Sequence, residues 1–270
     1  MQKAILFKIL QRRFKYRNPD NLTEIPMDIK YSAEEFESAS DYLRTLKRMQ
    51  ISFSHPEDTF YPEQFRRMKE PPLFFEYQGA PVWQDCQLLA VVGSREISPL
   101  TESWMKNHLP VFLNERRAGI VSGGARGVDQ LAHQIAVKCE VPTIVVLPSG
   151  LKNLYPRNLS ELRPLLSEGK LCLFSEFEID EELRKSHFFF RNRSIAAFGM
   201  ATLVTQATVK SGSWLTVHHT LDIGKQVLTI PAHPELLGFS GNLNLLQDGA
   251  VSISDSRSLI DFWIAESCSN

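Results

Sequence analysis

The stretch Ile120–His133, IVSGGARGVDQLAH, joins two patterns of different period through a glycine-rich turn. A strand-like apolar run ends near Val121, and a helix-like pattern begins near Val128. The turn between them contains three glycines and one cation, namely Gly123, Gly124, Gly127 and Arg126. Glycine lets the backbone adopt positive φ and approach a ligand closely, and the amides at the start of a helix favour an anion. The stretch therefore predicts a strand–turn–helix unit with an anion site at the turn.

The same alternation of apolar runs and amphipathic segments extends over residues 88–265. The runs are LLAVVGS, GIVSGG, TIVVLPSG, LCLFSE, ATLVTQA and QVLTIPA, beginning at positions 88, 119, 143, 171, 201 and 226. Continuous apolar strands that alternate with helices are typical of a parallel sheet covered on both faces. The sequence thus predicts an α/β fold with a doubly wound, mostly parallel sheet.

Two further segments precede this domain, so the predicted bounds are 1–50, 51–87 and 88–270. Residues 1–50 have apolar positions at helical spacing, and Ser32 with Glu35 has the spacing of a capping box. The cations near the start of this helical module are interpreted as a solvated helix face. Residues 51–87 are rich in proline and are predicted to be a linking segment, and DSRSLIDFWIAE is predicted to be the last helix.

Composition excludes several classes of protein. The 270 residues are 43% hydrophobic and 23% charged with a net charge of −1, so any polyanion site must be a local patch. The four cysteines lie far apart without a CxxC pair, which argues against a disulfide scaffold or a zinc site. No apolar run approaches the roughly 18 residues of a membrane span. We expect a soluble cytoplasmic protein that binds no membrane, no metal and no cofactor.

Four loops that follow predicted strands contain glycines, and each has a cation inside or beside it. These cations are Arg95, Arg126, Lys152 and Lys210. Ligands of open α/β sheets bind at the carboxyl ends of strands, where these loops lie. A single such loop is explained by a tight turn alone, but four together favour anion binding.

Familiar motifs for nucleotide binding and for hydrolysis are absent. GGARGVD lacks the glycine spacing of GxGxxG, and neither GxxxxGK[ST] nor GxSxG occurs. Asp129 and His133 are one helical turn apart with nothing to place Ser122 beside them, so a structural role is favoured over a triad. The adjacent His218 and His219 point about 100° apart on a helix and cannot bind one metal.

The stretch Arg184–Met200, RKSHFFFRNRSIAAFGM, interleaves cations with three phenylalanines. Aromatic rings stack on the bases of single-stranded nucleic acid, and arginines contact its phosphates. Alternatively, the phenylalanines belong to the core and the arginines form surface pairs. Periodicity leaves both interpretations open.

A series of segments in this chain resembles the DprA/Smf family of DNA-processing proteins. In chain order the segments are VVGSR, IVSGGARGVDQLAH, LPSGLKNLYPRN, FFFRNRSIAAFG, SGSWLT and GNLNLLQDGA. The resemblance covers about residues 50–260. It implies an extended Rossmann-like domain that binds single-stranded DNA, protects incoming DNA, loads the RecA recombinase during natural transformation and forms a homodimer. It implies no catalysis.

The resemblance also implies which residues contact DNA. They are Gly93, Ser94, Arg95, Ser122, Gly123, Gly124, Arg126, Gly127, Lys152, Tyr155, Arg191, Asn192, Arg193, Ser211, Gly212 and Ser213. We call the loops after the first three predicted strands the first loop (with Gly93 to Arg95), the second loop (with Ser122 to Gly127) and the third loop (with Lys152 and Tyr155). In the second loop, amides are expected to hold phosphates while Arg126 adds charge. Lys152 and Tyr155 occupy the loop where the family uses a cation and a ring near a base.

The chain departs from the family pattern at three places. Gln206 stands where a glutamate is usual, and Pro231-Ala232-His233 where Pro-Gly is usual. The first 50 residues lack the glycine-containing hairpins of a SAM-like domain, so we expect a shortened or diverged module. The dimer interface is guessed to lie near FSGNLNLLQDGA.

Two other functions remain open. Phosphoribohydrolases have a similar fold with a GGxGTxxE loop, but here SGSWLTVHH has no carboxylate, and losing an acid or base costs about 10²–10⁴-fold in rate. A nucleotide sensor that binds a small phosphorylated signal is the other alternative.

Overall fold

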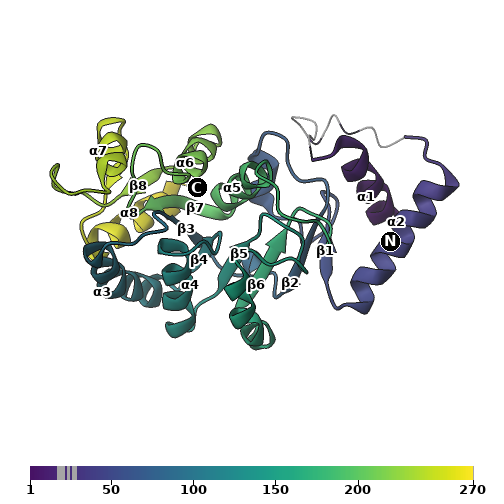
Figure 1. The fold of residues 1–270 in the computed structure, drawn as a ribbon, viewed down its shortest axis with the longest axis horizontal. Helices are drawn as coiled ribbons and strands as arrows, with labels where there is room; N and C mark the ends of the chain where they lie inside the picture. Colours follow the sequence, from purple (N-terminus) through teal and green to yellow (C-terminus); the bar gives the residue numbers. More distant parts are fainter. Residues whose placement is uncertain (17–21, 23–24, 26–28, 270) are drawn as a thin grey trace.

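A computed structural model of the chain describes residues 1–16, 22, 25 and 29–269. Within them, nine strands form one sheet in the order β1-β2-β6-β5-β4-β3-β7-β8-β9 (Figure 1). Their bounds are β1 Ser52–Ser54, β2 Phe75–Gly79, β3 Leu88–Val92, β4 Gly119–Ser122, β5 Thr143–Val146, β6 Leu171–Ser175, β7 Gly199–Val204, β8 Val227–Thr229 and β9 Val251–Ser252. Strands β3 to β9 pair in parallel, whereas β1 and β2 run antiparallel to their neighbours.

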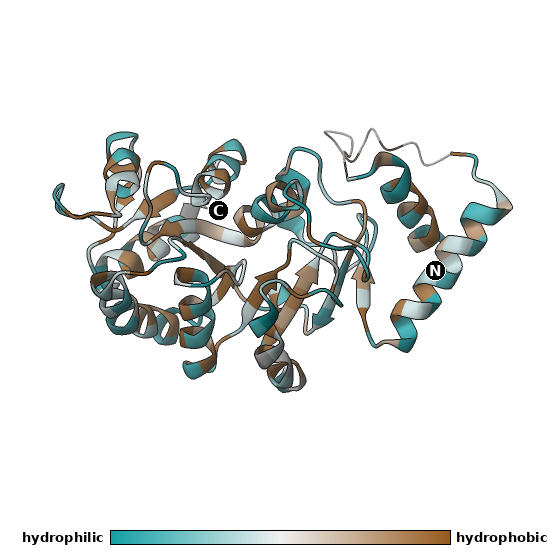
Figure 2. Ribbon diagram, viewed as in Figure 1, coloured by the Kyte–Doolittle hydropathy of each residue, from teal (hydrophilic) through white to brown (hydrophobic). Residues whose placement is uncertain are grey.

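Helices cover both faces of the sheet. They are α1 Gln2–Phe14, α2 Ala33–Arg48, α3 Pro99–Arg116, α4 Val128–Lys138, α5 His187–Phe198, α6 Ser213–Asp222, α7 Ser240–Gln247 and α8 Ser256–Ser269, with 3₁₀ segments η2 Glu63–Arg67, η3 Val82–Gln84 and η4 Arg157–Glu168. The helices α3, α4 and α8 share one buried cluster with the sheet, and α5, α6, α7 and η2 share another. Figure 2 shows hydrophobic residues along the central strands and hydrophilic residues mainly on the helices and loops around them.

The predicted α/β class and the doubly wound, mostly parallel sheet are confirmed. Each of the six apolar runs forms a strand, β3 to β8, because it is buried on both faces. Residues 51–87 differ from the expected linking segment, since they contribute β1 and β2 to the sheet. Aromatic packing explains their place: the ring centroid of Phe75 lies 4.8 Å from that of Phe174, and that of Phe65 lies 4.6 Å from that of Phe198.

The N-terminal helices α1 and α2 pack at the β1–β2 end of the sheet (Figure 1). The capping box is confirmed, because the Glu35 amide donates to Ser32 Oγ at 3.1 Å and the Ser32 amide donates to the Glu35 carboxylate at 2.8 Å. Lys8 of α1 does not belong to the expected solvated helix face: it is fully buried, with its ammonium 3.4 Å from Glu76 and 3.3 Å from Glu178. None of the described helices is both long and apolar enough to cross a bilayer.

Behind the glycine-rich turn, α4 buries His133 in its neutral form. Its Nδ1 lies 2.7 Å from the hydroxyl of Thr143, which itself donates to the Ile120 carbonyl at 3.1 Å, so Nδ1 carries the proton. Among the described residues nothing contacts Nε2 as a hydrogen-bond partner. Burial, aided by the charge of Arg191, lowers the pKa of His133 to about 3.

We expect His133→Asn to flatten the acid side of the stability profile. The unfolded chain binds a proton near pKa 6.5, whereas the folded protein does so only near 3, so stability falls as pH drops between these values. One such group contributes a slope of about 1.4 kcal/mol per pH unit. Urea unfolding at pH values from 8 to 4 should therefore show, below about pH 6.5, a slope smaller by this amount in the variant. Parallel profiles for the two proteins would contradict the assignment.

Candidate nucleic-acid interface

The topological switch point of the sheet lies beside β3. This strand pairs with β4 on one side and with β7 on the other, and all three run parallel. Ligands of open α/β sheets bind at such a point, beyond the carboxyl ends of the strands. A cavity of about 330 Å³ opens there, lined by the segments that follow β3, β4 and β7 and by α5 and α6. We call it the switch-point cavity.

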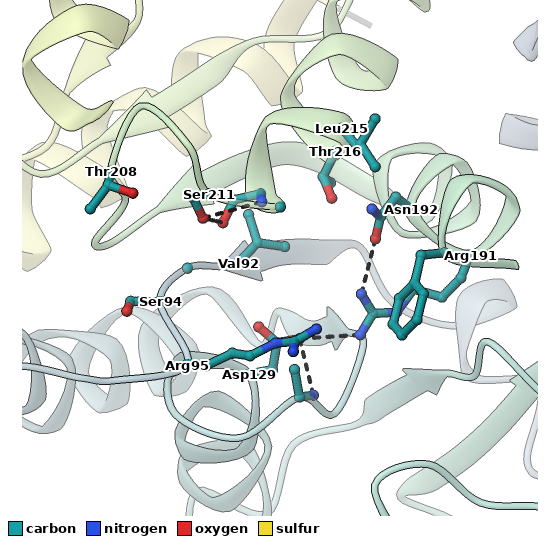
Figure 3. Close-up of a pocket in the computed structure, with 15 residues that line it drawn as sticks. Val92, Ser94, Arg95, Asp129, Arg191, Asn192, Thr208, Ser211, Leu215 and Thr216 are labelled. Atoms are coloured by element: carbon teal, nitrogen blue, oxygen red, sulfur yellow. Dashed lines mark hydrogen bonds and ion pairs between the residues drawn. The ribbon is translucent and has the colours of Figure 1, made fainter. Parts of the chain in front are cut away.

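The switch-point cavity brings together three of the predicted groups. These are Gly93, Ser94 and Arg95, then Arg191 and Asn192, then Ser211, Gly212 and Ser213. Figure 3 shows Arg95 extending toward Asp129 and Arg191, with Ser211 and Thr216 across the cavity. Two guanidinium groups thus face hydroxyls and the N-terminus of α6, where amides favour an anion. The arrangement suits a phosphate.

Gln206 holds the loop that presents Arg95. The Ser94 amide donates to the Gln206 carbonyl at 2.8 Å. The Gln206 side chain accepts from the Ser98 amide at 2.8 Å and donates to the Glu96 carbonyl at 3.2 Å. An ionised glutamate here would accept from Ser98 but would have no proton to donate to Glu96. The departure from the family pattern therefore closes this loop through two side-chain bonds.

Asp129 holds the second loop from beneath. Its Oδ2 accepts from the amides of Gly123 at 3.2 Å and Ala125 at 3.3 Å, and lies 3.4 Å from Nη2 of Arg191. Burial raises the pKa of Asp129, while Arg191 and the two amides oppose that rise. The amide of Gly123 is therefore bonded within the protein, which corrects the expectation that it holds a phosphate.

Arg191 reaches the cavity from a buried position. Its Nη1 donates to Oδ1 of Asn192 at 2.9 Å, and its Nε donates to the Val146 carbonyl at 3.3 Å. A Cβ on Gly123 would lie 1.5 Å from the guanidinium, so Gly123 has to be glycine for Arg191 to cross it. Arg191 consequently shapes the loop as well as charging the cavity.

Two other glycines differ in what they contact. Gly127 has φ +86°, and a Cβ there would lie 2.4 Å from the carbonyl oxygen of Ser94 and 2.7 Å from that of Arg95. The first and second loops are thus packed backbone to backbone. Gly212 has an ordinary φ of −63°, and no described atom lies within 4 Å of the place that a Cβ would take there. Its surroundings are open, as close approach by a ligand requires.

Other predicted residues lie outside the cavity lining. Arg193 is buried and donates to Glu176 at 2.6 Å, so it is not presented to a ligand at this site. Ser122 is buried and donates to the Val91 carbonyl at 2.6 Å. Gly124, at φ +70°, packs against Leu159.

The remaining predicted residues are exposed and also lie outside the cavity lining. Arg126 is exposed on the second loop. Lys152 is exposed but pairs with Asp180 at 2.8 Å. The ring of Tyr155 lies 6.1 Å from that of Phe188, which lines the cavity. The region of Pro231-Ala232-His233 does not contribute to the lining.

The cavity also contains residues that the sequence prediction missed. They are Val92, Ala125, Asp129, Phe188, Thr208, Leu215 and Thr216. Helical spacing was a usable signal for Thr216, which lies one turn beyond Ser213 on α6. Phe188 belongs to the aromatic stretch and faces this cavity. Phe189 is 44% exposed, and its ring lies 5.6 Å from that of Phe190.

Comparison with known proteins gives one matching family and several relatives. The model of the family described as DNA recombination-mediator protein A matches residues 52–263. Protein Smf of Escherichia coli is 32% identical over 207 residues, which are 76% of this chain and 55% of that protein. DNA processing protein DprA of Streptococcus pneumoniae is 32% identical over 210 residues, 77% of this chain and 73% of that one. The chain thus spans only about half the length of the E. coli relative.

Two solved structures share the fold closely. The X-ray structure of DNA processing protein A from S. pneumoniae has a TM-score of 0.76 at 25% identity and covers 96% of this chain and 92% of its own. DNA processing protein A from Helicobacter pylori has a TM-score of 0.70 at 28% identity, covering 80% of this chain and 97% of its own. The latter structure is described in terms of its single-stranded DNA binding mode.

Proposed function

Because the chain belongs to the DNA recombination-mediator protein A family, we propose that it binds single-stranded DNA at the switch-point cavity. In this role it protects incoming DNA and loads a RecA-type recombinase during natural transformation. One observation carries the proposal: Arg95 and Arg191 converge on a cavity bordered by glycine turns and the N-terminus of α6. The single-stranded DNA binding mode described for the H. pylori relative supports it.

We further propose that the cavity binds DNA without catalysis. Within the described lining, the one carboxylate is that of Asp129. This carboxylate accepts hydrogen bonds from two backbone amides and forms an ion pair with Arg191, so it is not positioned as a general base for a ligand. This geometry disfavours the phosphoribohydrolase alternative, whose chemistry needs a free acid or base.

A second copy of the chain is proposed as a partner, in addition to the recombinase. The segment guessed for the interface forms α7, where Leu245 is buried. Exposed leucines lie just before it, in the loop after β8: Leu236 is 38% exposed and Leu237 is 95% exposed. A fully exposed leucine beside a half-buried helix suits a contact with another apolar surface.

Arg95→Ala tests the proposed site. We expect affinity for oligothymidylate to fall about tenfold, and the slope of log affinity against log salt to shrink by about 0.7, because one phosphate contact is lost. Fluorescence anisotropy at several salt concentrations measures both. Arg48→Ala, which removes an exposed arginine from α2 at the far end of the molecule, is the matched control.

An unchanged salt slope with full affinity in Arg95→Ala would remove this loop from the site. Competition by free mononucleotides at concentrations similar to the oligonucleotide would instead favour the nucleotide-sensor alternative.

A further inference from the structure

We propose that a second cavity, between α1 and the start of α5, is an additional subsite for one nucleotide of the strand that occupies the switch-point cavity. This inference rests on the proposed function. The cavity has a volume of about 530 Å³, larger than the switch-point cavity, and joins the C-terminus of α1 to the turn after β6. We call it the α1–α5 cavity. This proposal gives the N-terminal helical module a direct role in binding single-stranded DNA.

The two cavities lie on either side of the first turn of α5. Phe188 lines the switch-point cavity, and Phe190 lines the α1–α5 cavity. The third loop is joined to the turn that lines the α1–α5 cavity, since the Gly150 amide donates to the Glu181 carbonyl at 2.9 Å and the Lys152 amide donates to the Ile179 carbonyl at 3.0 Å. A strand that leaves the first cavity past Phe188 would pass around the first turn of α5 to reach the second.

The α1–α5 cavity carries positive charge beyond what its acids neutralise. Glu178 lies 2.6 Å from Arg12 and 3.3 Å from the buried Lys8. Glu181 lies 3.1 Å from Arg184. Lys15 is exposed, and no described acidic side chain pairs with it. Each carboxylate is thus already matched by a cation, and Lys15 remains for a phosphate.

Aromatic rings line the same cavity. They are those of Tyr16 and Phe190, whose centroids lie 6.0 Å apart. The ring of Tyr16 also lies 5.0 Å from that of Phe177, which is buried and is not part of the lining. The backbone holds Tyr16 there in an uncommon conformation, with φ +49° at Lys15 and φ +69° at Tyr16. Non-glycine residues at positive φ are strained and persist where the surrounding structure demands it. Rings next to unmatched positive charge suit a base and its phosphate.

The test compares short and long oligothymidylates on the full chain. With about 4 nucleotides only the switch-point cavity is filled, whereas about 16 nucleotides reach both, within the site sizes of single-strand binders. In Lys15→Glu we expect affinity for the long oligonucleotide to fall about fivefold or more, and its salt slope to decrease by about 0.7. Affinity for the short one should stay unchanged. Lys47→Glu, the same charge change at an exposed site on α2, is the control.

The possible outcomes separate this subsite from the proposed function. Equal affinity of wild type and Lys15→Glu for the long oligonucleotide overturns the subsite alone. An equal loss with both lengths also overturns it, because the charge would then act on the first cavity. If the wild-type chain binds neither oligonucleotide, the proposed function and the subsite fail together. Thermal unfolding of Lys15→Glu and of Lys15→Gln verifies that the exposed substitutions leave the fold intact.

Discussion

Arg191→Ala is expected to lower the free energy of unfolding by about 3–5 kcal/mol, because it leaves Asp129 buried without its cation. The carboxylate of Asp129 is 3.4 Å from the guanidinium and lies beneath the second loop. The same change removes the donors to Asn192 and Val146. Urea unfolding at neutral pH measures the loss.

The control for this prediction is a solvent-exposed ion pair on the protein surface. Arg257 and Asp261 pair at 3.1 Å on α8 with largely exposed side chains, so Arg257→Ala should cost at most about 0.5 kcal/mol. Adding Asp129→Asn to Arg191→Ala should restore part of the lost stability, since it removes the unpaired buried charge. A small effect of Arg191→Ala, close to that of Arg257→Ala, would show that the pair does not support the loop.

Gly127→Ala is expected to weaken binding of oligothymidylate by about 10–100-fold. A Cβ at this position would lie 2.4 Å from the Ser94 carbonyl oxygen, so the loop that presents Arg95 must move. Loss of a charge-assisted hydrogen bond costs about 1.5–3 kcal/mol, which corresponds to this range of affinity. The positive φ adds a strain of about 1–3 kcal/mol to the folded state.

Gly169→Ala separates the two effects of that substitution. Gly169 also has a positive φ, +71°, but no described atom lies within 4 Å of its would-be Cβ. The Gly169→Ala variant should lose stability through backbone strain while retaining full affinity for oligothymidylate. If Gly127→Ala and Gly169→Ala bind equally well, contact between the first and second loops does not position Arg95.

The local pattern of the sequence was sufficient for strands β3 to β8 and for the edge of the sheet that carries the site. Strands β3 to β8 are short runs that are apolar on both faces and separated by amphipathic helical segments, so their length and composition identify them. Strands β1 and β2 were missed because prolines surround them and because β2, with which β1 pairs, is itself held by antiparallel pairing with β6, about a hundred positions away. No periodic pattern within residues 51–87 indicates this pairing with a distant strand.

The order of residues along the chain is therefore enough to predict the α/β class, the glycine loops at the carboxyl edge and their association with cations. Which of those cations face a ligand depends on the folded arrangement. Arg193 pairs with Glu176, 17 positions away, and Arg191 pairs with Asp129, 62 positions away. Removing a charge from water requires a partner that neutralises it, and the fold, not the neighbouring sequence, brings that partner. Arg95 has no such partner among the described residues and stays in the cavity.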